Sequence, residues 1–433
     1  MNNFRVITNA TTIINDNLII DPWIYGDVYY SAWSPYPDPK YSKTKLKKIK
    51  YCFISHIHPD HWDLKTIRFF KKNVKFFIPD LIYNRIIEKK LREEGFKNFT
   101  YLSFGKLHLI SKEYKFGVVP ALNQDGQEKI RHYKKDNPPG IDASLVVQTQ
   151  NDKKNHLVLT DNTPYNYKIY KRHFGNLKIT SCFFPYNGID DYPLCYDNLT
   201  LSQKKKITKK RCLNREKALL SFFKKIKPEV IIPHSSDFSL NVRKKEFNTL
   251  HSGEFMEKDL YSKRIQKISK IKCIPLYEDD ILYYNGKKFK EIINSSKKSR
   301  TRIRKNVKVI IPKPDLGTKL SDLMIKSFKN YIYRLKKYNF NTKYFDNWKL
   351  FVVLSDKQKY LIDPTKNILQ KINGEKIKKK NLLILNTSEN LFRCILQRKL
   401  HINNCGGACI LSWQRYPNKF NKDFNESLNF FHI

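Results

Sequence analysis

Apolar and polar positions alternate near the start of the chain in a pattern that predicts β-structure. Residues 4–14 read FRVITNATTII, residues 15–17 follow as a turn, and residues 18–20 resume as an apolar run. This pattern predicts a β-hairpin that leads into a buried strand. Asp21-Pro22 ends that strand, because proline cannot donate the hydrogen bond that a central strand needs.

Short apolar strands then alternate with helices through the first 240 residues. The predicted strands comprise residues 51–55, 74–78, 116–119, 144–149, 156–160, 179–184 and 230–232. The predicted helices, which have apolar residues at helical spacing, comprise residues 64–72, 81–94 and 217–226. Such alternation is typical of a layered α/β architecture. The chemically interesting side chains follow strand ends, where open sheets place their sites.

A basic, Ser-rich stretch divides the chain. Residues 295–308, SSKKSRTRIRKNVK, are predicted as a linker between a domain of residues 1–294 and a smaller α+β domain of residues 309–433. The smaller domain contains a predicted helix over 321–337 and predicted strands over 349–353 and 359–362. A second basic run, at 204–211, is predicted as a solvated loop or the start of a helix.

Length and composition exclude several classes of protein. The 433 residues allow two or three domains, and the 40% hydrophobic content excludes a disordered chain. Neither G-x-G-x-x-G nor G-x-x-x-x-G-K-[ST] occurs, which disfavours dinucleotide-binding and P-loop folds. No apolar run approaches the ~18 residues of a membrane span, and residues 1–18 do not resemble a secretory signal. We therefore expect a cytoplasmic protein.

The charge balance is strongly basic but diffuse. Lys and Arg number 83 against 40 Asp and Glu, for a formal net charge of +43. The lysines are spread along the whole chain, and Asn, Ile and Tyr are abundant too, as A/T-biased codon usage produces. This spread disfavours a nucleic-acid partner, which would call for a basic patch. Basic side chains near the site would instead attract a small anionic substrate.

The eight cysteines do not form a metal-binding or disulfide pattern. None belongs to a C-x-x-C pair, and the close pair Cys405 and Cys409 flanks a glycine turn. We expect reduced thiols.

The strongest chemical feature is His56-x-His58-x-Asp60-His61, which directly follows the predicted strand YCFIS. Three imidazoles and a carboxylate within six residues suit borderline divalent metals. On a tight loop, His56 and His58 can face one ion while Asp60 and His61 face a second. Two such ions share a bridging water and lower its pKa, and Asp60 is the predicted acceptor of the water's proton.

The segment ISHIHPDHWD resembles the H-x-H-x-D-H signature of the metallo-β-lactamase fold. Weaker resemblances are LIIDPW at 18–23, LVLTDNTP at 157–164 and VIIPH at 230–234. The resemblance implies an αββα sandwich over roughly residues 4–240 and two divalent ions, zinc or iron/manganese. The implied ligands are His56 and His58 for one ion, Asp60, His61 and His234 for the other, and Asp161 for both. Asp21 is implied to orient a ligand histidine from behind.

One position departs from the family pattern. Hydrolases of the fold carry a further histidine after the strand that corresponds to residues 116–121, and here VVPALNQDG places Asn123 there. Asp125, His132 and Asp142 are the alternatives that would fold back to complete the first site. An oxygen-rich first site suits iron or manganese better than an all-histidine site.

Finer features resemble the branch that contains CMP-N-acetylneuraminate hydroxylase and bacterial relatives acting on nucleotide-linked sugars. They are DPWIYG at 21–26, PYNG at 185–188, YPLC at 192–195 and WQRYP at 413–417. The best-known members of that branch carry a Rieske domain, and the Cys-x-His and Cys-x-x-His spacing of such a centre does not occur in this sequence.

Three functions follow as hypotheses. The leading one is hydrolysis, by a metal-bound hydroxide, of an anionic substrate such as a phosphoester, lactone or amide. The alternative is an O₂-dependent di-iron hydroxylase that acts on a nucleotide-activated sugar in cell-surface polysaccharide metabolism, with an electron-transfer protein as partner. The third is a nuclease or nucleic-acid-binding protein, motivated by the net charge.

Overall fold

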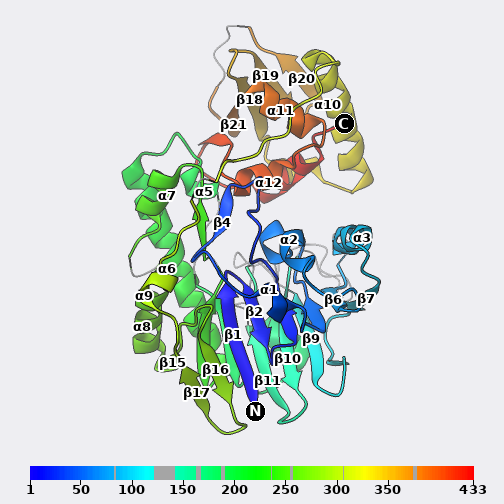
Figure 1. The fold of residues 1–433 in the computed structure, drawn as a ribbon. Coiled ribbons are helices and arrows are strands. Elements are labelled where there is room, and N and C mark those ends of the chain that lie inside the picture. Colours follow the sequence, from blue (N-terminus) through cyan, green and yellow to red (C-terminus); the bar gives the residue numbers. More distant parts are fainter. Residues whose placement is uncertain are drawn as a thin grey trace.

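The computed structural model describes residues 1–81, 84–120, 142–161, 167–186, 191–235, 237–253, 257–305, 307–373 and 378–433. Within these ranges the chain forms sheets of eight, seven and five strands and a two-stranded ribbon. The two large sheets lie in the lower part of Figure 1, with the N-terminus at their far end. The five-stranded sheet and the C-terminus lie in the upper part.

The first large sheet is mixed, with antiparallel pairs at one edge and parallel pairs from β3 onward. Its strands, in spatial order, are β17 (Phe289–Ile292), β16 (Ile281–Tyr284), β1 (Asn2–Thr8), β2 (Thr11–Ile14), β3 (Leu18–Ile20), β5 (Tyr51–Phe53), β6 (Lys75–Pro79) and β7 (Asn98–Leu102).

The second large sheet is also mixed, with β11, β12, β13 and β15 parallel to one another. Its strands, in spatial order, are β15 (Lys272–Cys273), β13 (Val230–His234), β12 (Ser181–Pro185), β11 (Lys154–Val158), β10 (Ala143–Thr149), β9 (Tyr114–Pro120) and β8 (His108–Leu109). The ribbon pairs β4 (Trp33–Pro35) with β14 (Phe238–Leu240).

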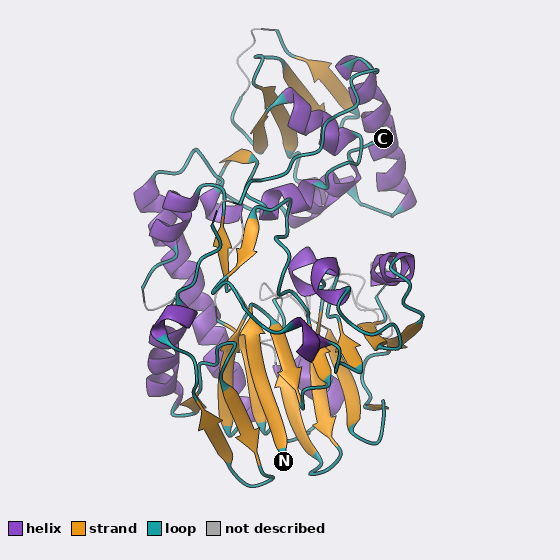
Figure 2. Cartoon of the chain, in the orientation of Figure 1, coloured by secondary structure: helices purple, strands orange, loops and turns teal. Residues whose placement is uncertain are grey.

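Helices cover the outer faces of the two large sheets (Figure 2). Those of residues 1–308 are α1 (Lys43–Leu46), α2 (Leu64–Ile67), α3 (Arg85–Glu93), α4 (Tyr167–Phe174), α5 (Asp191–Leu194), α6 (Leu201–Ile226), α7 (Lys244–Leu250), α8 (Lys258–Ser269) and α9 (Lys297–Arg300). Helix α6 begins with a capping box, in which Thr200 and Gln203 satisfy each other's backbone N–H groups.

Three apolar clusters hold these layers together. Between the sheets, Phe53 of the first packs in one cluster with Phe116 and Phe183 of the second. The outer face of the first sheet packs against Leu91 of α3, and that of the second packs against Phe222 of α6. The αββα sandwich that the sequence predicted is therefore confirmed, because each sheet buries apolar side chains on both faces.

The first strand differs from the sequence prediction. Residues 4–14 form two strands, β1 and β2, because Asn9 turns the chain with φ +43°. Asparagine tolerates this left-handed conformation better than most residues. The basic run at 204–211 lies in the first part of α6, as one of its two predicted alternatives had it. Lys204 donates to Glu246, while Lys205, Lys206, Lys209 and Lys210 are exposed. No helix of the described chain is long and apolar enough to cross a membrane.

The upper part of the chain is an α+β unit. Its sheet, in spatial order, consists of β20 (Ile368–Lys371), β19 (Lys359–Asp363), β18 (Lys349–Leu354), β21 (Leu382–Thr387) and β22 (Ser412–Tyr416). Its helices are α10 (Leu320–Lys337), α11 (Glu389–Leu396), α12 (Ile402–Gly407) and α13 (Lys422–Ser427). The apolar core of this unit is shared with the lower part, since Trp23 and Phe238 belong to the same cluster as Trp413. The division into domains 1–294 and 309–433 stays a prediction.

The stretch at 295–308 is tied to the sandwich. Arg302 pairs with Glu278 at 2.7 Å, and Arg304 pairs with both Asp27 and Asp38 at 2.8 Å. The pairs of Arg304 hold it against the loop that follows β3, and the pair of Arg302 holds it against the segment between β15 and β16.

The buried histidine of β11 makes folding stability depend on pH. His156 is fully buried beside Ser181 and the ring of Phe4, and burial lowers the pKa of His156 from 6.5 to about 4. Between these two values the unfolded chain binds more protons than the folded chain, so stability falls as pH falls. We expect His156 to contribute about 3 kcal/mol to the loss of unfolding free energy between pH 7 and pH 4. Denaturant unfolding of His156→Gln should show a correspondingly shallower pH dependence, and an unchanged dependence would contradict this assignment.

Candidate metal centre

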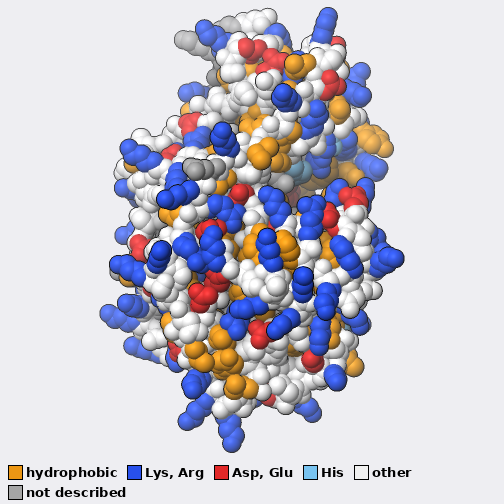
Figure 3. Space-filling model, viewed as in Figure 1, with side chains coloured by type: hydrophobic (Ala, Val, Ile, Leu, Met, Phe, Trp, Pro, Cys, Tyr) orange, Lys and Arg blue, Asp and Glu red, His pale blue; other side chains and the backbone are white. Residues whose placement is uncertain are grey.

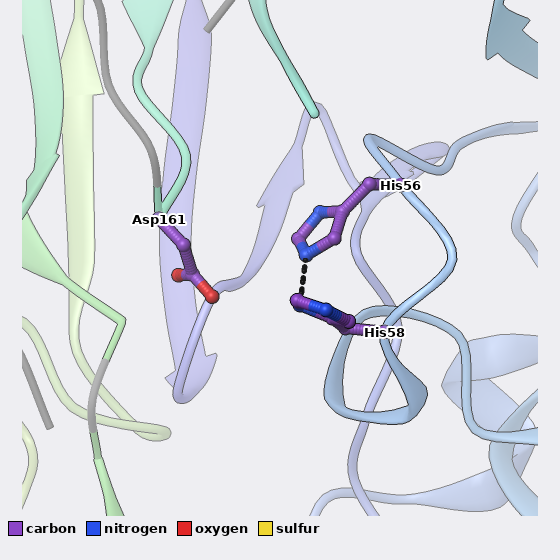
Figure 4. Close-up of side chains that lie close together, drawn as sticks. All are labelled: His56, His58 and Asp161. Carbon is purple, nitrogen blue, oxygen red and sulfur yellow. Dashed lines mark hydrogen bonds between the residues drawn. The ribbon is translucent and has the colours of Figure 1, made fainter. Parts of the chain in front are cut away.

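The structure brings the H-x-H-x-D-H segment together with Asp161. Donor atoms of His56, His58 and Asp161 lie within 4.8 Å of one another, and donor atoms of Asp60, His61 and Asp161 do the same. Figure 4 shows His56 and His58 side by side, facing Asp161 across the site, with His56 Nε2 2.9 Å from His58 Nδ1. Asp161 belongs to both groups, which is the position that a ligand shared by two ions requires.

Local structure fixes the loop that carries these histidines. The loop leaves the sheet at the carboxyl end of β5, and Pro59 begins a short 3₁₀ turn over Pro59–His61. Asp63 then caps α2 and also accepts a hydrogen bond from the Gly26 N–H at 3.0 Å. A Cβ at Gly26 would lie 2.2 Å from Asp63 Oδ1, so this close approach requires glycine.

Asp21 orients His61 from behind. His61 Nδ1 lies 2.7 Å from Asp21 Oδ2, while the other Asp21 oxygen accepts the Ser55 N–H at 2.8 Å. This contact turns His61 Nε2 toward Asp60 and Asp161, at 3.3 and 3.1 Å. The arrangement is the one that holds a metal-binding histidine in a single tautomer and ring orientation.

Asp142 takes the equivalent place behind His56. Its Oδ1 lies 3.4 Å from His56 Nδ1, and the Ser55 hydroxyl lies 2.8 Å from the same nitrogen. His56 Nε2 is thereby left to face His58. The sequence offered Asp142 as a substitute ligand, whereas the structure places it on the far side of the ring from the group.

The electrostatics of the group favour a cation. Burial opposes protonation of His61, but Asp161, Asp60 and Asp21 outweigh it and raise the pKa of His61 well above its usual value. Burial would raise the pKa of Asp161, but the charge of His61 and its hydrogen bond lower that pKa instead. Three carboxylates gathered in this way, of which Asp21 and Asp60 are buried, need positive charge to balance them.

His56 and His58 are neutral and can donate a ring nitrogen to a metal ion. Burial lowers the pKa of His56 and of His58 from 6.5 to about 4, and neighbouring imidazoles add to the effect. A neutral imidazole nitrogen is the form that binds metal. Neutral imidazoles and buried carboxylates together form a donor set that fits zinc, iron or manganese.

His234 lies outside both groups. It is buried at the end of β13, with Nε2 2.8 Å from the Leu159 carbonyl oxygen and Nδ1 3.4 Å from Thr12 Oγ1. Its proposed role as a ligand stays a prediction. Asn123, Asp125 and His132 lie outside the described residues.

Three contacts of the group were not expected from the sequence. Tyr29 donates from its hydroxyl to Asp60 Oδ1 at 3.0 Å, and Asn9 Nδ2 lies 3.3 Å from Asp60 Oδ2. Ser235 donates to Asp161 Oδ1 at 2.9 Å. Burial and the charge of Asp60 raise the pKa of Tyr29 well above its usual value, so the hydroxyl stays a donor. Asn9 and Ser235 directly follow strands, and this position in the sequence could have marked them as candidates for the site. Tyr29 lies in a loop, where no sequence pattern marks it.

A cavity of about 430 Å³ opens onto the group. His58, Asp60 and Asp161 line it from the sandwich, and Gly406 and Trp413 line it from the upper unit. The cavity is therefore built from both parts of the chain.

Relatives of known sequence match part of the chain. A Mycolicibacterium smegmatis protein named as a Rieske 2Fe-2S iron–sulfur protein is 26% identical over 184 residues, which is 42% of this chain and 33% of that protein. A Mycobacterium tuberculosis protein of the same name is 24% identical over 183 residues, with the same coverage. The chain thus covers about a third of the length of these curated relatives. None of the protein-family models matches the chain.

Solved structures of the metallo-β-lactamase kind are similar in outline. An isothiocyanate hydrolase from Delia radicum gut bacteria is 12% identical, with a TM-score of 0.40 over 66% of this chain and 99% of that one. A metallo-β-lactamase fold protein from Bacillus subtilis is 9% identical, with a TM-score of 0.37 over 65% of this chain and 98% of that one. Both TM-scores lie below 0.5, so the likeness is one of outline only. The narrower resemblance to nucleotide-sugar hydroxylases stays a prediction.

Asp21 provides a test of the orientation of His61. In Asp21→Asn the amide keeps the size of the side chain but loses the charge that holds His61 Nδ1–H. Loss of such an orienting partner typically lowers metal affinity by about 10–100-fold. Competition with a chromogenic chelator should show that weakening, while the circular dichroism spectrum stays unchanged. Equal affinity in the variant and the parent would remove Asp21 from the metal centre.

Proposed function

We propose that the chain is a metal-dependent hydrolase of a small anionic substrate. The proposal depends above all on one observation: two overlapping His/Asp groups share Asp161 at the wall of a cavity. His56, His58 and Asp161 would hold one divalent ion, and Asp60, His61 and Asp161 the other. Bound ions of this kind lower the pKa of water and polarise the bond to be cleaved.

The side chains around Asp60 support its role in moving a proton. Tyr29 and Asn9 hold the two carboxylate oxygens in place, and both are buried. Burial raises the pKa of Asp60, but His61 outweighs burial and keeps the carboxylate ionised. An ionised carboxylate at the cavity wall can accept the proton that the attacking water releases and pass it to the leaving group.

An O₂-dependent di-iron hydroxylase is the second candidate. The partial similarity to proteins named for a Rieske 2Fe-2S centre favours it, because such a centre is an electron carrier. This function would place iron in the same two groups and would need a separate electron-transfer protein.

One experiment separates the two candidates. Protein purified in air is analysed for zinc, iron and manganese, and each metal-reconstituted form is assayed with p-nitrophenyl phosphate, an aryl ester and a lactone. Hydrolysis by a metal-reconstituted form, without O₂ uptake, supports the hydrolase. Bound iron together with O₂ uptake that depends on an added reductant supports the hydroxylase and overturns the hydrolase.

The basic surface provides the test of the third candidate, a nucleic-acid function. Lys and Arg side chains are spread over the face shown in Figure 3 and are interspersed with acidic ones. We expect weak binding to duplex DNA that falls steeply with salt, because released counterions provide most of its free energy. Electrophoretic mobility shifts across a salt series measure this. Binding that selects one sequence at near-physiological salt would instead favour a nuclease or a nucleic-acid-binding protein.

A further inference from the structure

The described residues that line the cavity carry a different balance of charge from the chain as a whole. Although Lys and Arg total 83, Arg215 is the one such side chain among the described residues that line the cavity. Four carboxylates of the described residues line it as well, and two of them, Asp60 and Asp161, belong to the His/Asp groups. Asp191 and Glu426 are the other two. Two divalent ions in those groups would give the described lining a net positive charge, so this step depends on the proposed function.

Arg215 has its donors free for a ligand. It lies half-buried on α6, and the described residues offer it no hydrogen bond or ion pair. The adjacent carboxylate, Glu216, is already occupied, because Arg264 of α8 binds it through two contacts at 2.9 and 3.1 Å. A guanidinium presents a planar fork of donors that fits a carboxylate or a phosphate through two hydrogen bonds.

Aromatic side chains provide the apolar wall of the same cavity. Trp33 stacks on Phe238 with ring centroids 3.6 Å apart and an interplanar angle of 5°, and both line the cavity. Phe420 also lines it, although its side chain is 56% exposed. An exposed phenyl ring at a cavity wall is a surface on which a planar or apolar ligand can pack.

We infer that Arg215 anchors the anionic group of the substrate, a carboxylate or a phosphate carried on a planar or apolar body. The aromatic wall binds the planar or apolar part of the substrate. The ions held by the two His/Asp groups would act on a bond elsewhere in the same molecule, away from the anchored anionic group. The cavity volume of about 430 Å³ lies toward the lower end of the ~300–1,000 Å³ of small-molecule sites, so the substrate is a small molecule.

The test measures binding and therefore needs no knowledge of the substrate. Phenyl phosphate and benzoate are the anionic probes, and benzyl alcohol is their neutral counterpart; each is titrated calorimetrically into the full chain, with bound metal and after chelator treatment. We expect the anions to bind more tightly than benzyl alcohol to the metal-loaded chain. Arg215→Gln should lower the affinity of the chain for both anions by about 10-fold or more. Arg215→Lys should recover part of that loss, because charge returns without the fork. The tighter of the two anions identifies the group, phosphate or carboxylate.

Lys217→Gln is the matched control, since it removes the same charge from an exposed position two residues further along α6. It should leave the affinity of both anions unchanged. Three results would overturn the inference: neither anion binds at millimolar concentration, Arg215→Gln binds as the parent does, or Lys217→Gln weakens binding equally.

The metal content of the variants keeps this inference separate from the proposed function. Arg215→Gln should retain the metal of the parent, because Arg215 belongs to neither His/Asp group. If the parent binds no metal and anion binding still depends on Arg215, the hydrolase proposal fails and the anion site stands. If metal is bound and Arg215 has no effect on the anions, the anion site fails alone.

Discussion

Replacing His58 or Asp161 with alanine is expected to remove bound metal and activity together. His58 Nδ1 lies 2.9 Å from His56 Nε2, and Asp161 belongs to both donor groups, so each substitution leaves a group of three with two members. Orienting partners alone contribute about 10–100-fold to metal affinity, so loss of a direct ligand should weaken binding by about 100-fold or more. Asp161→Ala should have the larger effect, because it takes a donor from both groups. Elemental analysis after gel filtration measures the metal content.

The matched control is His108→Ala. His108 makes its own contact, with Nε2 2.9 Å from the Ser103 carbonyl oxygen, and it belongs to neither group. This variant should keep the metal content and the activity of the parent. Full metal occupancy in both His58→Ala and Asp161→Ala would contradict the assignment. We expect all three variants to fold, because the ligands stand on loops at strand ends while the apolar clusters lie between the layers.

The parts of the site that the sequence predicted are local in the chain. His56, His58, Asp60 and His61 lie within six residues after a strand, so one tight loop necessarily brings them near one another. Asp161, about 100 residues further along the chain, was implied only by the resemblance of LVLTDNTP to a strand of the family, and it follows β11, which runs parallel to β12. The strand and helix pattern was predictable for the same reason, since each element is encoded by its own apolar periodicity.

The sequence could not predict how the histidine rings of the site are oriented. Asp142 was offered as a ligand, but which side of His56 it faces is set by the packing of two strands from different sheets. His234 ends β13 as expected, yet its Nε2 lies 2.8 Å from the backbone carbonyl oxygen of Leu159. A motif gives the position of a side chain along a strand, whereas the hydrogen bond that turns the ring comes from another part of the chain.

The cavity depends on contacts at the longest sequence separations. Trp33 donates to the Gly407 carbonyl oxygen at 2.8 Å, and Tyr30 accepts a hydrogen bond from the His401 N–H at 3.0 Å. No sequence pattern in the segment of Tyr30 and Trp33 predicts its contact with the segment of His401 and Gly407. The upper unit, which the sequence predicted as a separate domain, thus supplies a wall of the cavity.

A chain that ends at residue 308 is therefore expected not to form a stable, soluble monomer. Twelve buried residues of the lower part belong to the apolar cluster of the upper unit, namely Trp23, Val28, Tyr29, Ala32, Trp33, Leu194, Cys195, Tyr196, Phe238, Leu240, Phe247 and Leu250. Full burial of such a side chain contributes about 1.5–3 kcal/mol. If removal of the upper unit costs roughly 1 kcal/mol at each position, the total of about 12 kcal/mol matches the whole ~5–15 kcal/mol of a typical domain.

Size-exclusion chromatography and thermal unfolding of the chain of residues 1–308 measure this effect. We expect aggregation, binding of a hydrophobic dye and loss of the cooperative transition that the full chain shows. Co-expression of residues 309–433 as a separate chain is the control, because restoring the shared cluster should recover a soluble complex with bound metal. A monomer of residues 1–308 that unfolds cooperatively within about 1 kcal/mol of the full chain would instead establish two independent domains, since only a self-sufficient core keeps its stability when its neighbour is removed.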